Sequence, residues 1–115
     1  MKELFDEISI KCSEITTKSY STSFSLGIRL LNKQNHNPIY SIYGFVRLAD
    51  EIVDSFHDYK KKELLEQFRL ETKLAIENKI SLNPILNSFQ NVVNSFNIEW
   101  EHIDNFLKSM QHDLE

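Results

Sequence analysis

The sequence predicts an all-α protein, and three observations support that fold class. Glycine and proline are scarce, with two of each in 115 residues, so the chain lacks the turn residues that a strand-rich protein needs. Apolar residues recur at steps of three and four, which is the period of a helix. The chain is also long enough for one domain with one hydrophobic core. We therefore expect a single domain over residues 1–115, a helical bundle of about five to six helices.

The first part of the chain shows two helical segments. The first covers residues 4–18, and its expected buried face contains Leu4, Phe5, Ile8, Cys12 and Ile15. Hydroxyl side chains in residues 19–23 then compete for backbone groups and favour a turn or a helix cap. A shorter apolar pattern follows over residues 24–31, and residues 32–37 are expected to form a polar loop.

The next helix is expected to begin where Asn37 precedes Pro38, because asparagine is a favoured N-cap and proline is favoured at the first helical position. It runs to about residue 56. Its expected apolar face contains Ile39, Ile42, Phe45, Val46, Ala49, Ile52, Val53 and Phe56.

Three further helices complete the expected bundle. The first spans residues 61–78, with Leu64, Leu65, Phe68, Leu74, Ala75 and Ile76 as its buried residues. Asn83 and Pro84 repeat the start signal of asparagine before proline. They open a helix whose apolar residues are Ile85, Leu86, Phe89, Val92, Val93 and Phe96. The last helix begins near Glu99 and carries Trp100, Ile103, Phe106, Leu107 and Met110.

Bulk properties exclude several classes of function. The net charge of -4 argues against a nucleic-acid partner, because binding to phosphates needs clustered Lys and Arg. Cys12 is the only cysteine, so no disulfide can form within the chain. The N-terminus shows no signal peptide, and no run approaches the roughly 20 apolar residues of a membrane span. The expected location is the cytoplasm.

Four side chains that could take part in binding or catalysis lie in a line on the helix expected over residues 38–56. They are Tyr43, Arg47, Asp50 and Asp54. Their steps of four, three and four place them within roughly a 60° arc of the helix surface, with the apolar face centred about 120° away. One side of this helix is therefore expected to pack against the core. Another side presents a phenol, a guanidinium and two carboxylates, a set that we call the stripe.

Two carboxylates at this spacing repel each other unless a cation lies near them. Asp50 and Asp54 would be about 5–6 Å apart at their Cβ atoms. Mg²⁺, or Mn²⁺ as an alternative, suits them because such ions take oxygen ligands and bridge carboxylates to a substrate phosphate. Arg47 could add a planar fork for a phosphate oxygen. Tyr43 could donate a hydrogen bond or turn its ring toward a cation.

A plainer interpretation of the stripe stays open at this point. Arg47 and Asp50 could form a surface ion pair worth only about 0.3–0.5 kcal/mol. Asp54 and Glu51 could simply be solvated. The many apolar residues on this helix, however, favour a central place in the fold, with the stripe facing a cavity.

Several segments resemble the squalene and phytoene synthases. Residues 21–24, Ser-Thr-Ser-Phe, match that family's hydroxyl-rich segment ending in Ser-Phe. Residues 39–54 are similar to its Tyr-Ala-x-x-Arg-x-x-Asp-Asp-x-x-Asp helix, and residues 83–98 and 106–114 are similar to the later part that contains Met-x-x-Asp-Leu. The resemblance spans nearly the whole chain in the right order.

The resemblance implies an isoprenoid-synthase fold in which two prenyl diphosphates join head to head, with Mg²⁺ required. By position, Asp50 and Asp54 would bind the metal, while Arg47 and Tyr43 would be catalytic. The substrate-binding set would be Ser21, Phe24, Arg47 and Asp113. The implied activity is that of a prenyltransferase of carotenoid or other isoprenoid biosynthesis. A lipophilic product also implies contact with a membrane surface.

Two departures from the family pattern matter. Glu51 stands where the family usually has a second aspartate, although Asp50 and Asp54 are intact. The family also has a second aspartate-rich motif well downstream, and this chain stops at Glu115 without one. We therefore expect an N-terminal portion of one synthase domain, inactive by itself, with the remainder absent. Helices without their partners would expose apolar faces and drive self-association.

Two other interpretations remain open. A head-to-tail prenyl synthase or a terpene cyclase also uses an aspartate-rich helix, but Arg47 and residues 21–24 favour the head-to-head family. A non-enzymatic helical family member or an assembly factor is the second, and the intact stripe argues against it. The product, whether squalene, dehydrosqualene or phytoene, depends on cavity depth and on redox partners outside this chain.

Overall fold

The computed structural model describes residues 1–114, without the side chains of residues 22–24. Every regular element in that part of the chain is a helix, so the predicted all-α class is confirmed. The elements are α1 (Lys2–Tyr20), α2 (Thr22–Arg29), the short 3-10 helix η1 (Lys33–Asn35), α3 (His36–Asp54), α4 (Lys61–Asn78), α5 (Pro84–Phe96) and α6 (Trp100–His112). None of the helices in residues 1–114 is both long enough and apolar enough to cross a membrane.

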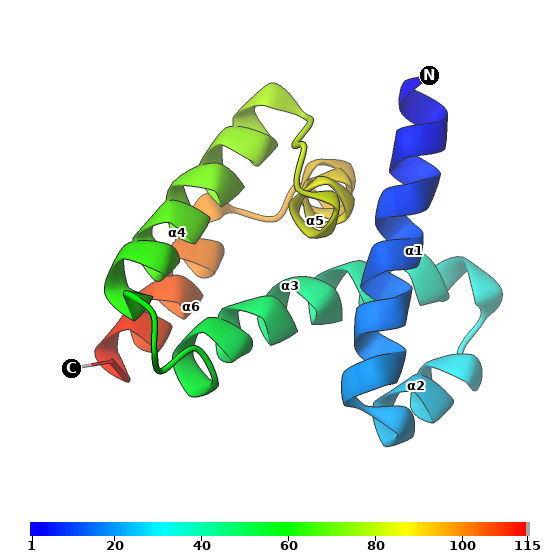
Figure 1. Cartoon of the computed structure of the whole chain (residues 1–115). Coiled ribbons are helices and arrows are strands. Elements are labelled where there is room, and N and C mark those ends of the chain that lie inside the picture. The colour runs from blue at the N-terminus through cyan, green and yellow to red at the C-terminus, as the bar shows by residue number, and fades with distance from the viewer. Residues whose placement is uncertain (115) are drawn as a thin grey trace.

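Helix α3 lies at the centre of the molecule. It contacts α1, α2, α4, α5 and α6. Figure 1 shows α1 and α2 at one end of α3 and the pair α4 and α6 at the other, with α5 between α1 and α4. The prediction that the helix carrying the stripe is central is therefore confirmed.

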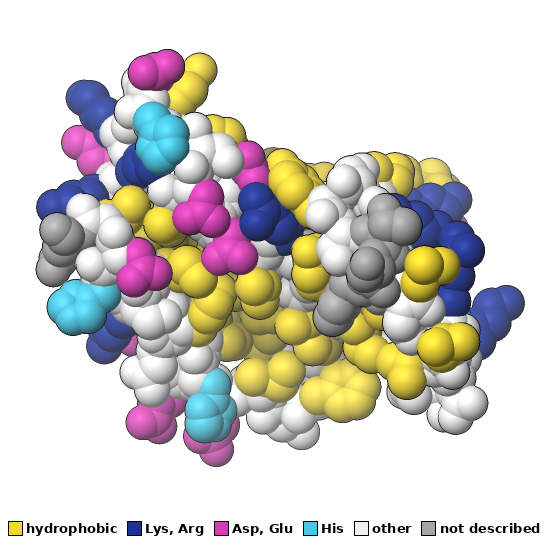
Figure 2. All heavy atoms as spheres, turned by 90° about the horizontal axis from the view of Figure 1, so that it is seen from below, with side chains coloured by type: hydrophobic (Ala, Val, Ile, Leu, Met, Phe, Trp, Pro, Cys, Tyr) yellow, Lys and Arg dark blue, Asp and Glu magenta, His cyan; other side chains and the backbone are white. Residues whose placement is uncertain are grey.

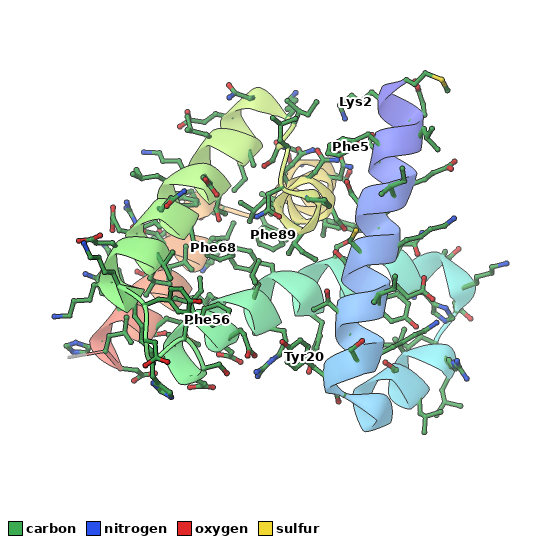
Figure 3. The ribbon with its side chains drawn as sticks, viewed as in Figure 1. Lys2, Phe5, Tyr20, Phe56, Phe68 and Phe89 are labelled. Carbon is green, nitrogen blue, oxygen red and sulfur yellow. The ribbon has the colours of Figure 1, made fainter. Side chains whose placement is uncertain are left out.

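A stack of phenylalanine rings fastens α3 to its neighbours. The ring of Phe45 lies parallel to that of Phe89 on α5, with centroids 3.9 Å apart, and close to that of Phe68 on α4 at 5.3 Å. Figure 3 shows Phe68 and Phe89 in the space between their helices. All three side chains are buried. Aromatic residues at the predicted helical spacing thus place α3, α4 and α5 around one core.

The buried face of α1 is not the apolar face that the sequence predicts. The fully buried side chains of this helix are Ser9, Ser13 and Thr17. On the predicted face, Leu4, Ile8 and Ile15 are exposed, while Phe5 and Cys12 are half-buried. The prediction was therefore wrong for α1, and its apolar side chains face outward.

Close contact between α1 and α3 explains this reversal. A Cβ atom added to Gly44 of α3 would lie 3.2 Å from the Cβ and Oγ atoms of Ser13, so the contact has room only for small residues. The hydroxyl of Thr17 donates to the Ser13 carbonyl at 2.9 Å, which satisfies that buried group within its own helix. Small hydroxyl residues therefore take the contact face, and the larger apolar residues cannot.

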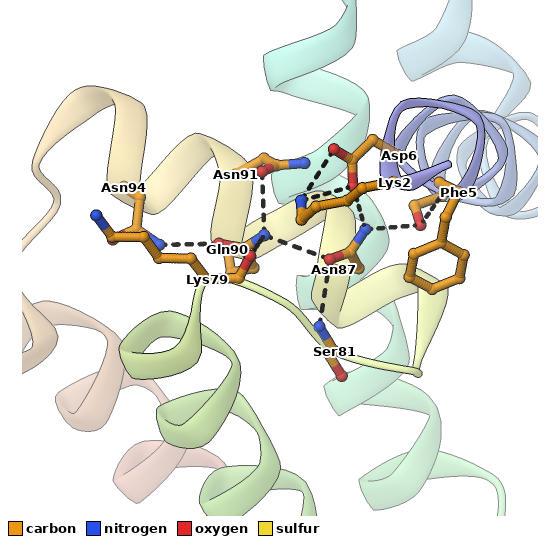
Figure 4. Close-up of polar contacts among 10 residues, drawn as sticks. Lys2, Phe5, Asp6, Lys79, Ser81, Asn87, Gln90, Asn91 and Asn94 are labelled. Atoms are coloured by element: carbon orange, nitrogen blue, oxygen red, sulfur yellow. Dashed lines mark hydrogen bonds and ion pairs between the residues drawn. The ribbon is translucent and has the colours of Figure 1, made fainter.

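A buried polar network joins α1 to α5, as Figure 4 shows. The Asn87 amide donates to Asp6 at 2.8 Å and to Ser9 at 3.0 Å, and its oxygen accepts from the backbone N–H of Ser81 at 3.2 Å. The Gln90 amide extends the network by donating to the carbonyl of Lys79 at 3.1 Å. Because buried amides must be satisfied, these bonds fix the register of α1 on α5.

The predicted helix starts agree with the structure at one of the two asparagine–proline signals. Asn83 caps α5, accepting from the N–H groups of Ile85 and Leu86, with Pro84 as the first helical residue. The start at Asn37 was wrong, since α3 begins at His36 directly after η1. Pro38 is still tolerated there because the first turn of a helix has N–H groups without internal partners.

Some predicted core positions also proved exposed. Ile42 on α3, Leu74 on α4 and Phe96 on α5 each extend to the surface. In their place polar residues are buried, namely Ser41, Thr72, Asn87, Ser88 and Gln90. The hydroxyls of Ser41 and Ser88 meet each other between α3 and α5. Helical period alone therefore marks the core of α3 to α6 correctly at most positions but not at the edges of each face.

An ion pair between α4 and α6 gives a testable effect on stability. Arg69 Nε donates to Asp104 at 2.7 Å, and Lys108 lies 3.3 Å from the same carboxylate. We expect Asp104→Asn to lower the free energy of unfolding by about 1 kcal/mol at neutral pH. Urea unfolding followed by circular dichroism measures this, with the exposed Glu77→Gln on α4 as the control.

The same pair predicts how that difference changes with pH. The hydrogen bond from Arg69 holds the pKa of Asp104 below its ordinary value. The stabilisation is therefore complete above the unfolded pKa of about 3.9 and is lost as the pH falls through the lower folded pKa. The difference in stability between the natural chain and the Asp104→Asn variant should shrink toward about pH 3. An undiminished difference at that pH would contradict the assignment.

Candidate functional site

The stripe runs from the middle of α3 to its C-terminal end, on the side away from the phenylalanine core. The side chains of Arg47 and Asp50 are 23% and 32% exposed, so both are partly shielded while remaining reachable. Tyr43 is half-buried and Asp54 is exposed. The four side chains thus pass from a protected end at Tyr43 to an open end at Asp54.

Arg47 is held more closely by Glu51 than by Asp50. Its Nη2 atom lies 2.5 Å from Oε2 of Glu51, whereas Nη1 lies 3.9 Å from Oδ2 of Asp50. Hydrogen bonding to Glu51 is the main cause that raises the pKa of Arg47. The plainer interpretation from the sequence is therefore right that Arg47 and Asp50 form an ion pair, which is a long one, and wrong that Glu51 is solvated. The Asp50 carboxylate keeps oxygen atoms that Arg47 does not occupy at hydrogen-bond distance.

Tyr20, at the end of α1, closes one side of this group. Its ring centroid lies 4.4 Å from Cζ of Arg47, which is a cation–π contact between α1 and α3. Figure 3 shows Tyr20 at the lower end of α1, next to α3. Hydrogen bonds from Ser55 and Arg47, with a smaller one from Tyr20, lower the pKa of Glu51. Tyr20, Arg47 and Glu51 therefore form one connected cluster.

Two other carboxylates act on Asp50 at the open end of the stripe. Burial raises the pKa of Asp50, and the negative charges of Asp54 and Asp113 raise it further, against the opposing effect of Arg47. Asp113 is the C-cap of α6, so its charge reaches Asp50 from a separate helix. A partly buried carboxylate with a raised pKa in such surroundings marks Asp50 as a candidate functional residue.

The remaining predicted substrate residues lie at the ends of two helices. Ser21 is the C-cap of α1, in extended backbone, and follows Tyr20 directly. The side chain of Phe24 lies outside the described residues. Ser21 thus adjoins Tyr20, which contacts Arg47, and the charge of Asp113 reaches Asp50 from α6.

The surface of the molecule also carries an apolar area. Figure 2 shows hydrophobic side chains gathered across the middle of one face, with acidic and basic side chains next to them. One hollow in the chain, of about 390 Å³, is bounded by α3, α5 and the loops that flank them. Its lining contains Leu31, Asn35, Pro38, Ile39, Ile42, Val92, Phe96 and Ile98. The molecule therefore combines apolar surface with a charged edge.

Comparison with known protein families shows to which family this chain belongs. The model of squalene/phytoene synthase matches residues 17–115, which includes α2 to α6 and the end of α1. The chain belongs to the squalene/phytoene synthase family. The resemblance predicted from the sequence is thereby confirmed. Searches of curated proteins and of solved structures gave no match.

Membership of the squalene/phytoene synthase family supports the fold class and the class of enzyme. The family consists of prenyltransferase-type enzymes with an all-α isoprenoid-synthase fold, and the helices of this chain agree with that fold. The matched region contains the whole stripe, together with Tyr20, Ser21 and Asp113. Most of α1, including the buried Ser9 and Ser13, precedes the match.

The number and type of oxygen donors test whether the site fits Mg²⁺. Within the described side chains, no group of three or more His, Cys, Asp or Glu residues is close enough to hold a metal ion by itself. Asp50 and Asp54 nevertheless suit Mg²⁺, which is commonly held by one or two carboxylates with waters and substrate phosphates. The donors therefore fit an ion shared with a diphosphate, and they do not fit an all-protein cage.

Sequence reasoning missed two members of the site. Glu51 lies four residues after Arg47, the spacing at which oppositely charged side chains on a helix meet, so this pair could have been anticipated. Tyr20 carries no local signal, because its contact with Arg47 depends on how α1 crosses α3. A long-range contact of that kind depends on how the two helices pack, and residue spacing along the sequence does not predict this packing.

Proposed function

We propose that this chain provides the first aspartate-rich half of a site for Mg²⁺-dependent head-to-head condensation of two prenyl diphosphates. The observation that supports this most is the pair Asp50 and Asp54 beside Arg47, with the charge of Asp113 acting on Asp50, on a helix that also lines an apolar hollow. The carboxylates suit a metal, the guanidinium suits a phosphate, and the apolar surface suits a hydrocarbon chain. Family membership supports the same assignment.

Each residue of the stripe has a defined task in this proposal. Asp50 and Asp54 hold Mg²⁺, which when bound neutralises negative charge on the departing diphosphate. Arg47 orients a phosphate oxygen through the N–H groups that Glu51 leaves free. Tyr43, one turn earlier at the protected end, contacts the reacting carbon chain beyond the phosphate. Ser21 and Phe24 complete the substrate contacts from α1 and α2.

The proposal includes the expectation that the 115-residue chain binds but does not convert its substrate. Its described carboxylates come from α3 and the end of α6, and they are too few to hold a metal cluster without further ligands. Incubation with a prenyl diphosphate and Mg²⁺ should give no condensed product. Calorimetry with a prenyl thiodiphosphate, an unreactive analogue, should show binding that EDTA abolishes.

Two results would overturn different parts of this proposal. Mg²⁺-dependent turnover by the chain alone would show that a complete catalytic site is present. Binding of the analogue with equal affinity in Mg²⁺ and in EDTA would show that the carboxylates hold no functional metal.

Exposed apolar side chains support self-association of the chain. Leu4, Ile8 and Ile15 on α1 are 49%, 45% and 64% exposed. Two further exposed leucines are Leu26, on α2, and Leu30, directly after that helix. Exposed apolar clusters of this kind promote association. Light scattering at increasing concentration should show a dimer or larger species, and Ile15→Glu should shift it toward monomer. A monomer at all concentrations would contradict this expectation.

A further inference from the structure

The cluster of Tyr20, Arg47 and Glu51 spans the contact between α1 and α3. The ring of Tyr20 covers one face of the Arg47 guanidinium, with 4.4 Å between its centroid and Cζ. Glu51 binds one end of the same guanidinium at 2.5 Å. The guanidinium is therefore held at a face and at an edge, by residues from two different helices.

These two contacts determine which N–H groups of Arg47 remain available. Nη2 is engaged by Glu51, and Nε is buried without a hydrogen-bond partner among the described groups. Nη1 points toward the open end of the stripe, 3.9 Å from Asp50 Oδ2. An anion bound to a metal at Asp50 would meet Nη1 first, because the rest of the guanidinium is occupied or enclosed.

Tyr20 contributes little to the hydrophobic core. Its side chain is 51% exposed, and the contact that the structure records for its ring is with Arg47. An aromatic side chain that leaves half of its surface in water and covers a cation on another helix is poorly explained by core packing. A role in fixing the plane of the guanidinium explains the same geometry.

We infer that Tyr20 is a positioning residue, which together with Glu51 fixes the plane of Arg47 so that Nη1 faces a metal-bound diphosphate at Asp50. The inference rests on the proposed function for the nature of the anion. It adds a residue from α1 to a site otherwise built on α3. It also gives a role to Glu51, which departs from the family's usual aspartate: its longer side chain reaches Nη2 of Arg47.

The test compares variants of the full chain with inorganic pyrophosphate and Mg²⁺ as the probe. Tyr20→Leu removes the ring, whereas Tyr20→Phe keeps the ring and removes the hydroxyl. Tyr59→Leu is the matched control, since Tyr59 is an exposed tyrosine in the loop before α4. Calorimetry gives the pyrophosphate affinity of each variant. The Nε–H signal of Arg47 in the nuclear magnetic resonance spectrum, assigned by its loss in Arg47→Lys, reports the stacking directly.

The expected results follow from the cation–π contact. Tyr20→Leu should weaken pyrophosphate binding by about two- to fivefold. Tyr20→Phe loses only the smaller hydrogen bond to Glu51, so it should stay close to the natural chain, as should Tyr59→Leu. In the ligand-free protein the Nε–H signal should be shifted upfield by the ring. That shift should vanish in Tyr20→Leu and persist in Tyr20→Phe. A merely structural role would instead lower the thermal midpoint of Tyr20→Leu and leave its pyrophosphate affinity unchanged.

Failure of the inference and failure of the proposed function give different results. If the natural chain binds Mg²⁺-pyrophosphate and Tyr20→Leu binds it equally well, the positioning role is overturned and the metal-diphosphate site stands. If the natural chain does not bind the probe, the proposed function is overturned together with the role that depends on it. An Nε–H signal without an upfield shift in the natural chain overturns the stacking on Arg47 whatever the binding result.

Discussion

Replacing Phe45 with alanine should lower the free energy of unfolding by about 3–5 kcal/mol, the largest effect we expect from a single substitution. Phe45 is 2% exposed, and its ring is stacked on Phe89 and packed against Phe68. Alanine would remove those ring contacts and leave a cavity where α3, α4 and α5 meet. The loss is large compared with the total stability of roughly 5–15 kcal/mol of a natural domain.

Urea unfolding followed by circular dichroism measures this loss. Phe96→Ala is the matched control, because Phe96 is 64% exposed at the end of α5 and should change stability little. Phe45→Leu should retain part of the stability, since it keeps more of the buried volume. A cost below about 1 kcal/mol for Phe45→Ala would contradict the central place of α3 in the core.

Asp50→Asn should reduce the affinity for pyrophosphate in the presence of Mg²⁺ at least about tenfold, which corresponds to about 1.4 kcal/mol. The substitution keeps the shape of the side chain and removes the charge that a divalent cation needs. Asp54→Asn should act in the same direction, and the double variant should bind no better than in EDTA. Asp58→Asn, in the exposed loop after α3, is the control that should leave the affinity unchanged.

Stability measurements separate loss of binding from loss of folding in this variant. Burial, together with Asp54 and Asp113, raises the pKa of Asp50 above its ordinary value. A carboxyl group with a raised folded pKa destabilises the folded chain at neutral pH, so a neutral asparagine should be tolerated. We expect Asp50→Asn to unfold at the same urea concentration as the natural chain, or at a higher one. Unchanged pyrophosphate affinity would contradict the assignment of Asp50 as a metal ligand.

The fold was predictable from the sequence where the local signals for a helix and the spacing of its apolar residues agreed with the packing. Asn83 and Pro84 start α5 through backbone geometry that they favour intrinsically, and Phe45 and Phe89 fall on the period that faces the core. The start of α3 was missed because η1 runs directly into it, so a helical turn precedes the proline. Local signals of this kind give the existence of a helix more reliably than its first residue.

The burial of α1 could not be predicted from hydrophobicity. Ser9, Ser13 and Thr17 are buried because α3 has Gly44 at its contact with α1, where the two helices approach closely. The short distance between the helices favours small side chains over the larger apolar ones. The identity of the facing residue is a property of the tertiary fold. The face of α1 that hydrophobic periodicity predicts to be buried is therefore the exposed one.

The stripe itself followed from spacing on one helix, which is why Tyr43, Arg47, Asp50 and Asp54 could be proposed from the sequence. Contributions from other helices could not be found in that way. Asp113 was suggested by resemblance, and the structure shows its charge acting on Asp50. Tyr20 was missed altogether, since its contact with Arg47 exists only after α1 and α3 have packed.

The central proposal is that α3 presents a metal-dependent diphosphate site, and a titration of the natural chain with pyrophosphate tests it most directly. Backbone amide signals in the nuclear magnetic resonance spectrum should be followed with Mg²⁺ and again with EDTA. Saturable shifts at Arg47, Asp50 and Asp54, extending to Asp113 and present only with Mg²⁺, are the predicted result. Shifts confined to the lysine-rich start of α4 at residues 60–62, or equal shifts with and without Mg²⁺, would contradict it.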